Sequence, residues 1–315
     1  MEIRRYGERG LIRLIRSVYD YSWEDSDAAR IEIGNRYLLI TNDSITKATH
    51  IPDSASPEAV GYFFAAINLS DIAACGGTPK YFMSSLILPK ATDSRYLIGM
   101  EVGIRECLNR YNVKVIGGDF KEGKELAMTG IAIGEVDKAL AMERKNFKAG
   151  DVLCVTGSLG SNAAGYYMWK NGKKEGAKAL LGVEPRIKEG IFLSKNGVRA
   201  GIDLSDGVYS AISRISTIAG VGFEIHYDRL PISASASKVH ARYGISTEQL
   251  CLNFGGEYEL LFSISEPEFE SLRRKAARNG IAINMIGKVT ENGNVLIKDG
   301  AKRVIRYCGY EHFRS

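Results

Sequence analysis

The sequence lacks any long hydrophobic run: nowhere in its 315 residues does a stretch approach the ~18–20 unbroken apolar residues that a membrane span needs. It also lacks a strong charge of one sign, because 42 Lys and Arg oppose 37 Asp and Glu for a formal net charge of +5. This small surplus suits an anionic ligand, but it is no polybasic signature. We therefore expect neither a membrane nor a nucleic-acid partner.

Cysteines are few and badly spaced for structural use. The five are far apart, odd in number and free of any C-x-x-C pair: Cys75, Cys107, Cys154, Cys251 and Cys308. Disulfide frameworks and zinc ribbons both need better spacing. The N-terminal residues lead into a polar helical pattern without the apolar core of a signal peptide, so we expect a reduced, cytoplasmic protein.

The chain reads as two α/β domains. Hydrophobic residues make up 45% and charged residues 25%, an ordinary globular composition, and domains of about 100–200 residues predict two of them. Helical and strand patterns alternate along both halves, and a turn at residues 148–151 precedes a new strand. We therefore place one domain at residues 1–137 and another at residues 138–315, in an α/β (α+β) fold.

Turn and cap residues define several elements of the first half. The Gly-Asn pair at 34–35 predicts the turn of a hairpin over residues 31–40. The Ser-Pro-Glu run at 56–58 predicts a helix start, with Ser as N-cap and Pro at the first position. Residues 113–116 read as a short buried strand that ends in the Gly-Gly-Asp run at 117–119, where a ligand could approach the backbone closely.

The aspartates are the most informative residues. Six of them fall at predicted strand ends or helix starts, beside Gly, Ser, Thr or Asn: Asp27, Asp43, Asp71, Asp119, Asp203 and Asp206. Any single one of them is better explained as a helix cap or a turn residue. Six together favour a site for Mg²⁺, which takes oxygen ligands and usually bridges carboxylates to substrate phosphates.

Familiar phosphate-binding motifs are absent from the sequence. It contains neither a Walker-type G-x-x-x-x-G-K-[ST] nor a Rossmann G-x-G-x-x-G. Binding of phosphate groups would therefore rest on metal ions, on backbone N–H groups at Gly turns and on scattered basic side chains.

A series of motifs then occurs in one order along the chain. They are Thr41-Asn42-Asp43 followed by His50, AINLSDIAACGGTP at 66–79, Gly-Gly-Asp at 117–119, Arg144 before the second half, IDLSDG at 202–207, GEYELLF at 256–262 and GYEHF at 309–313. Together they closely resemble the signature of thiamine-monophosphate kinases. That family is related to aminoimidazole ribonucleotide synthetase, selenophosphate synthetase and the hydrogenase maturation protein HypE.

The resemblance implies an activity and a set of site residues. The activity is the ATP-dependent phosphorylation of thiamine monophosphate to thiamine diphosphate, in a homodimer whose first domains close their strands into a shared barrel. Several Mg²⁺ ions would be held by Asp27, Thr41, Asn42, Asp43, Asp71, Asp119, Asp203 and Asp206. Of these, Asp71 and Asp206 would act at the reaction centre. ATP would be contacted by Gly118, Asp119, Arg144 and Ser205, and thiamine monophosphate by His50, Glu257 and Tyr310.

The chain departs from the family pattern at five positions. Ser26 stands for an Asp, Glu101 for a Tyr, Phe120 for a small hydroxyl residue, Ser161 for an Asp and Tyr310 for a Trp. The neighbouring Asp25 could replace the acid that is lost at Ser26. The changes are compatible with a distant lineage, altered specificity or lost activity.

Two other functions therefore stay open. The first is another ATP-dependent enzyme of the superfamily, with aminoimidazole ribonucleotide synthetase as the leading member. Selenophosphate synthetase is disfavoured because no Cys lies in the first 74 residues, and the hydrogenase maturation protein because it ends in Cys whereas this chain ends in Ser315. The second is a non-catalytic protein that binds the nucleotide without turnover.

Overall fold

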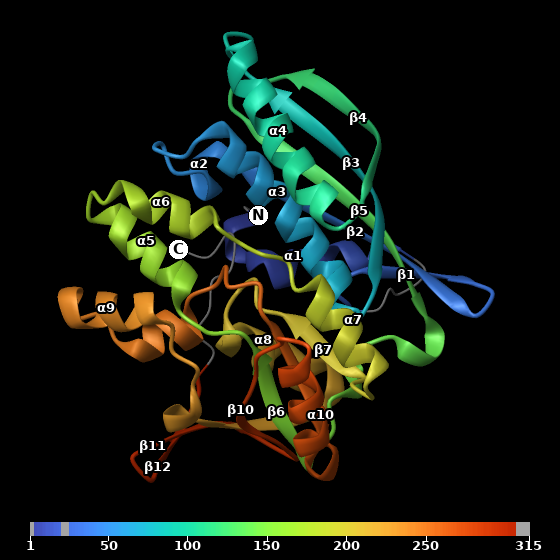
Figure 1. Cartoon of the computed structure of the whole chain (residues 1–315), viewed down its shortest axis with the longest axis vertical. Helices are drawn as coiled ribbons and strands as arrows, with labels where there is room; N and C mark the ends of the chain where they lie inside the picture. The colour runs from blue at the N-terminus through green and yellow to red at the C-terminus, as the bar shows by residue number, and fades with distance from the viewer. Residues whose placement is uncertain (1–2, 20–24, 307–315) are drawn as a thin grey trace.

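The computed structural model describes residues 3–19 and 25–306, which form two sheets with their helices (Figure 1). The first sheet has five strands in the order β1-β2-β5-β3-β4, and the second has seven in the order β12-β11-β8-β10-β6-β9-β7. The predicted two-part α/β fold is therefore confirmed. Within the described residues, no helix is long and apolar enough to cross a membrane.

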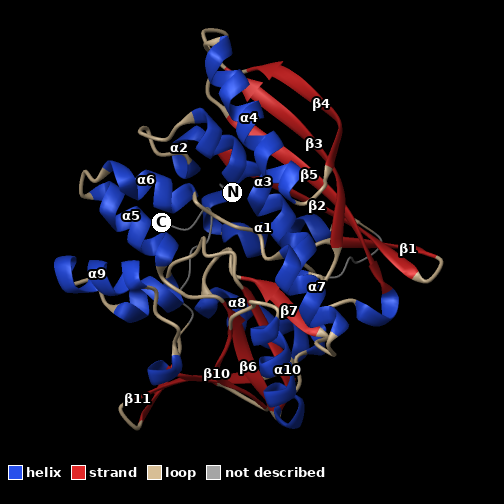
Figure 2. Ribbon diagram, viewed as in Figure 1, coloured by secondary structure: helices blue, strands red, loops and turns tan. Residues whose placement is uncertain are grey.

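The first sheet and its helices come from the N-terminal part of the chain. Their bounds are η1 Ile3–Arg5, α1 Gly7–Arg16, β1 Ala29–Ile33, β2 Arg36–Thr46, α2 Lys47–His50, α3 Pro57–Ala74, β3 Thr78–Leu88, α4 Ser94–Arg110, β4 Lys114–Glu122 and β5 Ala127–Asp137. β1 and β2 form the predicted hairpin, with Ile33 opposite Arg36 across the turn. Helices α3 and α4 pack side by side against this sheet (Figure 2).

The second sheet begins 14 residues after the first one ends, so the predicted boundary falls between β5 and β6. The connecting segment holds η2 Lys138–Leu140 and η3 Arg144–Asn146. The strands are β6 Asp151–Thr156, β7 Ala200–Asp203, β8 Gly222–His226, β9 Leu260–Ser265, β10 Ile283–Thr290, β11 Asn294–Lys298 and β12 Ala301–Val304. The helices are α5 Ser161–Lys170, α6 Lys174–Leu181, α7 Ile187–Lys195, α8 Val208–Ala219, η4 Tyr227–Arg229, α9 Ala234–Tyr243, η5 Gln249–Asn253 and α10 Glu266–Arg278.

Helix α3 begins as its sequence predicts. The Ser56 side chain accepts a hydrogen bond from the Ala59 backbone N–H, and Pro57 occupies the first helical position. The helix crosses α4 so closely that a methyl group at Gly61 would lie 1.9 Å from the Met100 carbonyl oxygen. Only a residue without a side chain allows this approach, which fixes the position of α3 on the first domain.

The same helix also belongs to the core of the second domain. One continuous apolar cluster joins Phe64 and Ile72 of α3 to Leu193 of α7 and Phe262 of β9. A methyl group at Gly190 of α7 would lie 2.2 Å from the carbonyl oxygen of Ala73 in α3, so the backbones of the two helices are in contact. Because α3 is buried on nearly all sides, it sets the geometry between the two sheets.

Strand β4 differs from its prediction. We expected a short buried strand over residues 113–116, but β4 continues to Glu122 and contains the whole Gly-Gly-Asp run. It pairs only with β3, at the edge of the sheet, and all of its residues are exposed. Val115, Ile116 and Phe120 are 60%, 53% and 56% exposed. The apolar residues at 113–116 are typical of a buried strand. Burial, however, depends on where a strand lies in its sheet, and β4 lies at the edge.

Candidate active site

A large cavity lies where α3 meets the second domain. Its volume is about 890 Å³, and residues of both domains line it. The predicted site residues that line it are Asp27, Thr41, Asn42, Asp43, His50, Asp71, Arg144, Asp203, Ser205 and Asp206. The structure therefore brings together most of the residues that the sequence motifs single out.

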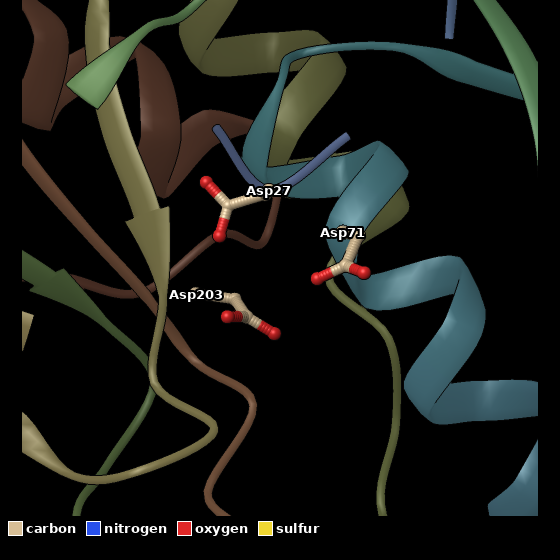
Figure 3. Close-up of side chains that lie close together, drawn as sticks. All are labelled: Asp27, Asp71 and Asp203. Atoms are coloured by element: carbon tan, nitrogen blue, oxygen red, sulfur yellow. The ribbon is translucent and has the colours of Figure 1, made fainter. Parts of the chain in front are cut away.

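Three of the carboxylates that line this cavity lie close together (Figure 3). Oxygen atoms of Asp27, Asp71 and Asp203 all lie within 4.8 Å of one another, although the residues come from the segment before β1, the last turn of α3 and the end of β7. No other group of three or more His, Cys, Asp or Glu side chains with this proximity occurs in the described part of the chain. Carboxylate oxygens in this arrangement are the donors that a hard divalent cation prefers.

Hydroxyl groups orient two of these carboxylates. The Ser70 hydroxyl donates to Asp203 Oδ2 at 2.8 Å, across the junction between α3 and β7. The Thr41 hydroxyl of β2 donates to Asp71 Oδ2. Both hydroxyl groups lie on neighbouring elements, so the packing of α3 against the two sheets determines how the carboxylates point.

A fourth carboxylate, Asp43 of β2, is held through its backbone. Its N–H donates to Asn68 Oδ1 at 2.9 Å, and the Asn68 amide in turn donates to the Phe64 carbonyl at 2.9 Å. Gly130 lies opposite Asp43 in β5, and a methyl group there would lie 2.4 Å from the Asn68 amide nitrogen. Asn68 is a positioning residue that our sequence reasoning missed; its only signal is a polar residue on an otherwise apolar helix.

Repulsion among the carboxylates makes the site ready for cations. Burial, with the charges of Asp206 and Asp27, raises the pKa of Asp43 to about 6. Burial and the charge of Asp27 raise the pKa of Asp203 to about 7, and burial with the charge of Asp43 raises the pKa of Asp71 well above its usual value. Each shift reports that the ionised form lacks sufficient positive charge nearby.

Arg144 supplies part of that positive charge. Its side chain is only 5% exposed, and it donates to Asp27 Oδ2 from Nε at 3.2 Å, to Asp27 Oδ1 from Nη2 at 2.5 Å and to Asp25 Oδ1 from Nη1 at 2.6 Å. The resemblance implies that Arg144 contacts ATP. In this structure its guanidinium is instead engaged by two carboxylates, so contact with a nucleotide stays a prediction.

Arg144→Met should lower the free energy of unfolding by about 3–5 kcal/mol in EDTA, because it leaves the buried Asp27 carboxylate without its counter-ion and leaves Asp25 with Arg214 alone. Urea denaturation followed by circular dichroism measures this. Arg36→Met is the matched control, since Arg36 also bonds two carboxylates, Glu135 and Asp137, but its side chain is 52% exposed. We expect the control to cost less than about 1 kcal/mol. Equal losses in the two variants would contradict the prediction.

Asp25 does not join the carboxylate cluster of Asp27, Asp71 and Asp203. Its carboxylate bonds to Arg144 and Arg214, and although burial raises its pKa, the charges of these two arginines outweigh that effect and hold the pKa below its usual value. Ser26 lines the cavity at the position of the family acid. The suggestion that Asp25 replaces this acid as a metal ligand is therefore not supported by the geometry.

The predicted thiamine-monophosphate contacts occupy two neighbouring places. His50 lines the large cavity, and its Nδ1 lies 3.2 Å from the Thr46 backbone nitrogen. Glu257 lies in an adjacent cavity of about 170 Å³, where Oε1 accepts a hydrogen bond from the Asn162 N–H at 3.0 Å. Burial raises the pKa of Glu257 to about 7. Tyr310 lies outside the described residues.

Gly118 and Asp119 lie apart from the cavity of their own chain. Both are on the exposed edge strand β4, and the Asp119 carboxylate pairs with Lys121 at 3.3 Å. Neither residue lines the cavity. Their contact with the nucleotide and Mg²⁺ therefore stays a prediction.

Aromatic side chains form another wall of the cavity, which sequence reasoning missed. The rings of Tyr166 in α5 and Phe254 after η5 lie 5.1 Å apart and are tilted by 41°. Both residues line the cavity, together with Leu180 and Leu181. Such a wall can pack against a planar ring. No sequence signal distinguishes these residues from ordinary core positions.

Comparisons with known proteins agree with this geometry. Residues 25–136 match the family model described as "AIR synthase related protein, N-terminal domain", and residues 148–299 match "AIR synthase related protein, C-terminal domain". The fold and the site therefore define a two-domain AIR synthase-related protein.

Individual relatives identify the family within this group. Thiamine-monophosphate kinase of Pyrococcus horikoshii is 31% identical over 98% of this chain and 96% of its own, and that of Bacillus subtilis is 32% identical over 88% of both. A solved structure described as AaThiL complexed with AMPPCP and TMP is 26% identical, covers 99% of both chains and superposes with a TM-score of 0.90. Thiamine-monophosphate kinase from Aquifex aeolicus gives a TM-score of 0.84 at 25% identity, over 96% of this chain and 99% of the other. The chain belongs to the thiamine-monophosphate kinase family.

Proposed function

We propose that this protein transfers the γ-phosphoryl group of ATP to thiamine monophosphate, giving thiamine diphosphate and ADP. The observation that carries the proposal is the buried carboxylate cluster of Asp27, Asp71 and Asp203, open to a cavity large enough for two ligands. The relatives reported above bear the name of this activity, and one solved relative is complexed with AMPPCP and TMP. Binding of ATP and thiamine monophosphate by this chain follows as part of the proposal.

The residues present fit Mg²⁺, because every side chain that would hold it offers oxygen. These residues are Asp27, Thr41, Asn42, Asp43, Asp71, Asp203 and Asp206. When bound, several Mg²⁺ ions would neutralise the charge that spreads over the transferring phosphoryl group. The acceptor oxygen is ionised at neutral pH, so no side chain needs to remove a proton from it. The carboxylates therefore act by holding the cations in place, and Asp71 and Asp206 are the two proposed to act at the reaction centre.

The remaining walls of the cavity suit the organic parts of the two ligands. Tyr166 and Phe254 offer aromatic faces to a planar ring, and a thiazolium cation gains further from such a face. His50 lines the same cavity and Glu257 the adjacent one, and both are the proposed thiamine-monophosphate contacts. Ser205, an exposed residue at the edge of the cavity, is placed to meet the nucleotide.

The active form is proposed to be a homodimer. Strand β4 leaves one edge unpaired and exposes Val115, Ile116 and Phe120, an apolar surface of the kind that partners cover. Tyr81 of the neighbouring β3 adds a ring that is 43% exposed. Association through this surface would bury β4 and carry Asp119 away from solvent toward the second chain, where the carboxylate could complete that chain's cavity.

Phe120→Asp should prevent this association, because it places a charge on the exposed apolar surface of β4. We expect the dissociation constant of the dimer to rise at least about 30-fold, as for other central interface residues, and kinase activity to fall with the dimer population. Sedimentation velocity over a concentration series measures the first effect. The control is Val304→Asp on β12, a residue that is 68% exposed far from β4. A Phe120→Asp protein that sediments like the wild type would rule out this interface.

The test of the proposed function is a direct assay. The purified protein is incubated with ATP, Mg²⁺ and thiamine monophosphate, and the thiamine phosphates are separated by chromatography. Thiamine diphosphate that accumulates in step with ADP, and is absent with EDTA, supports the proposal. Nucleotide binding without this product would point to another substrate or to a non-catalytic role, and a panel that includes the substrate of aminoimidazole ribonucleotide synthetase would separate these two.

A further inference from the structure

The large cavity contains a second arginine that the sequence motifs do not assign. Arg214 lies on α8, lines the cavity and has a side chain that is 35% exposed. Its Nε and Nη2 atoms both lie 2.9 Å from Asp25 Oδ1. Within the described residues no other side chain bonds to this guanidinium. Arg214 thus combines a fixed position with a charged surface that faces the cavity.

Arg144 and Arg214 differ in what they can do for a ligand. The buried Arg144 donates hydrogen bonds from Nε, Nη1 and Nη2 to Asp27 and Asp25. It would have to break its bonds to both carboxylates before it could bind a phosphate. Arg214 directs two nitrogens to a single oxygen of Asp25, and its Nη1 has no hydrogen-bond partner among residues 3–19 and 25–306. Of the two arginines that line the cavity among the described residues, Arg214 is therefore the one available to an anion.

The residues around Arg214 form a chain of alternating charge. It runs from Asp27 at the metal cluster through Arg144 and Asp25 to Arg214, with every link a hydrogen-bonded ion pair. Asp25 is shared by both arginines, so it holds the two guanidinium groups in a fixed relation. The cavity lining has no lysine among the described residues, and an arginine fork suits phosphate oxygens better than a point charge.

We propose that Arg214 binds a non-bridging oxygen of a substrate phosphate group, and that Asp25 and Arg144 are the positioning residues that aim it into the cavity. The proposal rests on the proposed function only in assuming that phosphorylated ligands enter this cavity. The phosphate could belong to the nucleotide or to the acceptor. Both offer the same oxygen chemistry, and the experiment below distinguishes them.

The experiment measures binding rather than turnover. Isothermal titration calorimetry with Mg²⁺ gives the dissociation constants of AMPPCP and of thiamine monophosphate, each alone, and of adenosine and thiamine as ligands without phosphate. We expect Arg214→Met to weaken binding of at least one phosphorylated ligand by about 10–100-fold, as for the loss of a charge-assisted hydrogen bond. Adenosine and thiamine should bind equally to both proteins. Weakening of AMPPCP alone identifies the nucleotide phosphate, and weakening of thiamine monophosphate alone identifies the acceptor phosphate.

Two further variants control for fold and charge. Arg273→Met on α10 is the matched control, because Arg273 also directs Nε and Nη2 to one oxygen of Glu270, at 3.2 and 2.9 Å, on an exposed helix. It should leave every dissociation constant unchanged. Arg214→Lys keeps the charge and the partner Asp25, so it should fold and bind with intermediate affinity. If Arg214→Met does not fold, this variant carries the test, and wild-type affinity for both phosphorylated ligands in the Lys variant would overturn the proposal.

The positioning role of Asp25 is tested by non-additivity. Asp25→Asn should weaken the same phosphorylated ligand that Arg214→Met weakens, and the double variant should bind it no more weakly than Arg214→Met alone. Effects that simply add would overturn the positioning role. If both phosphorylated ligands bind Arg214→Met within two-fold of wild type, the phosphate-binding role itself is wrong. This binding test is independent of the test of the proposed function. A protein that makes no thiamine diphosphate can still bind a phosphorylated ligand through Arg214.

Discussion

Asp71→Asn should lower the rate of ADP formation by about 1,000-fold at saturating Mg²⁺ while leaving the metal-free fold at least as stable as the wild type. The Asp71 carboxylate is one of three whose oxygens lie within 4.8 Å of one another. Loss of its charge removes a proposed cation ligand, and stabilisation of a phosphoryl transition state by metal ions amounts to several kcal/mol. The same loss removes repulsion from Asp43 and Asp203, which is the cause, after burial, of the raised pKa of Asp71.

A coupled assay for ADP and thermal unfolding in EDTA measure the two halves of this prediction. Asp228→Asn is the control, since Asp228 is an exposed residue of η4 outside the cavity. It should change neither rate nor stability. Turnover of the Asp71→Asn protein within a few-fold of wild type would show that this carboxylate has been misplaced in the mechanism. A large loss of stability would show that its role is structural.

The metal-free protein should become less stable as the pH rises from 5.5 to 8, with a fall in melting temperature on the order of 5 °C. The folded-state pKa of Asp43 is about 6 and that of Asp203 about 7, both above the unfolded value near 3.8. Between these values the folded chain binds more protons than the unfolded chain. Stability therefore falls with increasing pH as these groups ionise, and it is recovered as the pH drops below the folded-state values.

Mg²⁺ should reverse this trend. A cation that binds the folded carboxylates stabilises that state by mass action, and it competes with protons for the same oxygens. The gain in melting temperature on adding Mg²⁺ should accordingly be larger at pH 8 than at pH 5.5. Differential scanning fluorimetry in matched buffers measures it, with Asp203→Asn as the variant that should flatten the pH dependence in EDTA. An equal Mg²⁺ effect at both pH values would contradict the prediction.

Much of the fold can be read from local signals. Two or three neighbouring residues are enough to predict the start of α3 at Ser56-Pro57 and the turn between β1 and β2 at Gly34-Asn35. Caps and tight turns depend on nearby backbone groups, so their signal is local. The exposure of β4 is different. Its apolar residues are compatible with a strand at the centre or at the edge of a sheet. Only the strand order determines whether they are buried or exposed.

The candidate site was predictable to a similar degree. Motif resemblance identified residues that the fold gathers into one cavity, but it gave no information on which side chains already hold one another. The bond between Arg144 and Asp27 spans 117 positions in sequence, and the one between Arg214 and Asp25 spans 189. Contacts of this kind depend on how the two domains pack, so a reading of local pattern assigns each partner separately.

The positions of the clustered carboxylates differ in one respect from the sequence prediction. We placed its aspartates at strand ends and helix starts, as is usual for loop-borne ligands. Asp43 instead lies within β2 and Asp71 within the last turn of α3. Both are therefore held by regular backbone hydrogen bonding, with Asn68 and Thr41 as side-chain supports. Such ligands move less than loop residues do, which suits a site that must bring polyanions together.

Helix α3 has a consequence for how the protein can be divided. Because its Phe64 and Ile72 pack into the same apolar cluster as Leu193 and Phe262, the boundary between β5 and β6 separates two stretches of chain but not two folding units. A fragment ending at residue 137 would expose to water the surface of α3 that packs against the second domain. We expect such fragments to aggregate when produced separately and to recover a native structure only when both are present together. Hinge opening between the sheets would break the same apolar contacts.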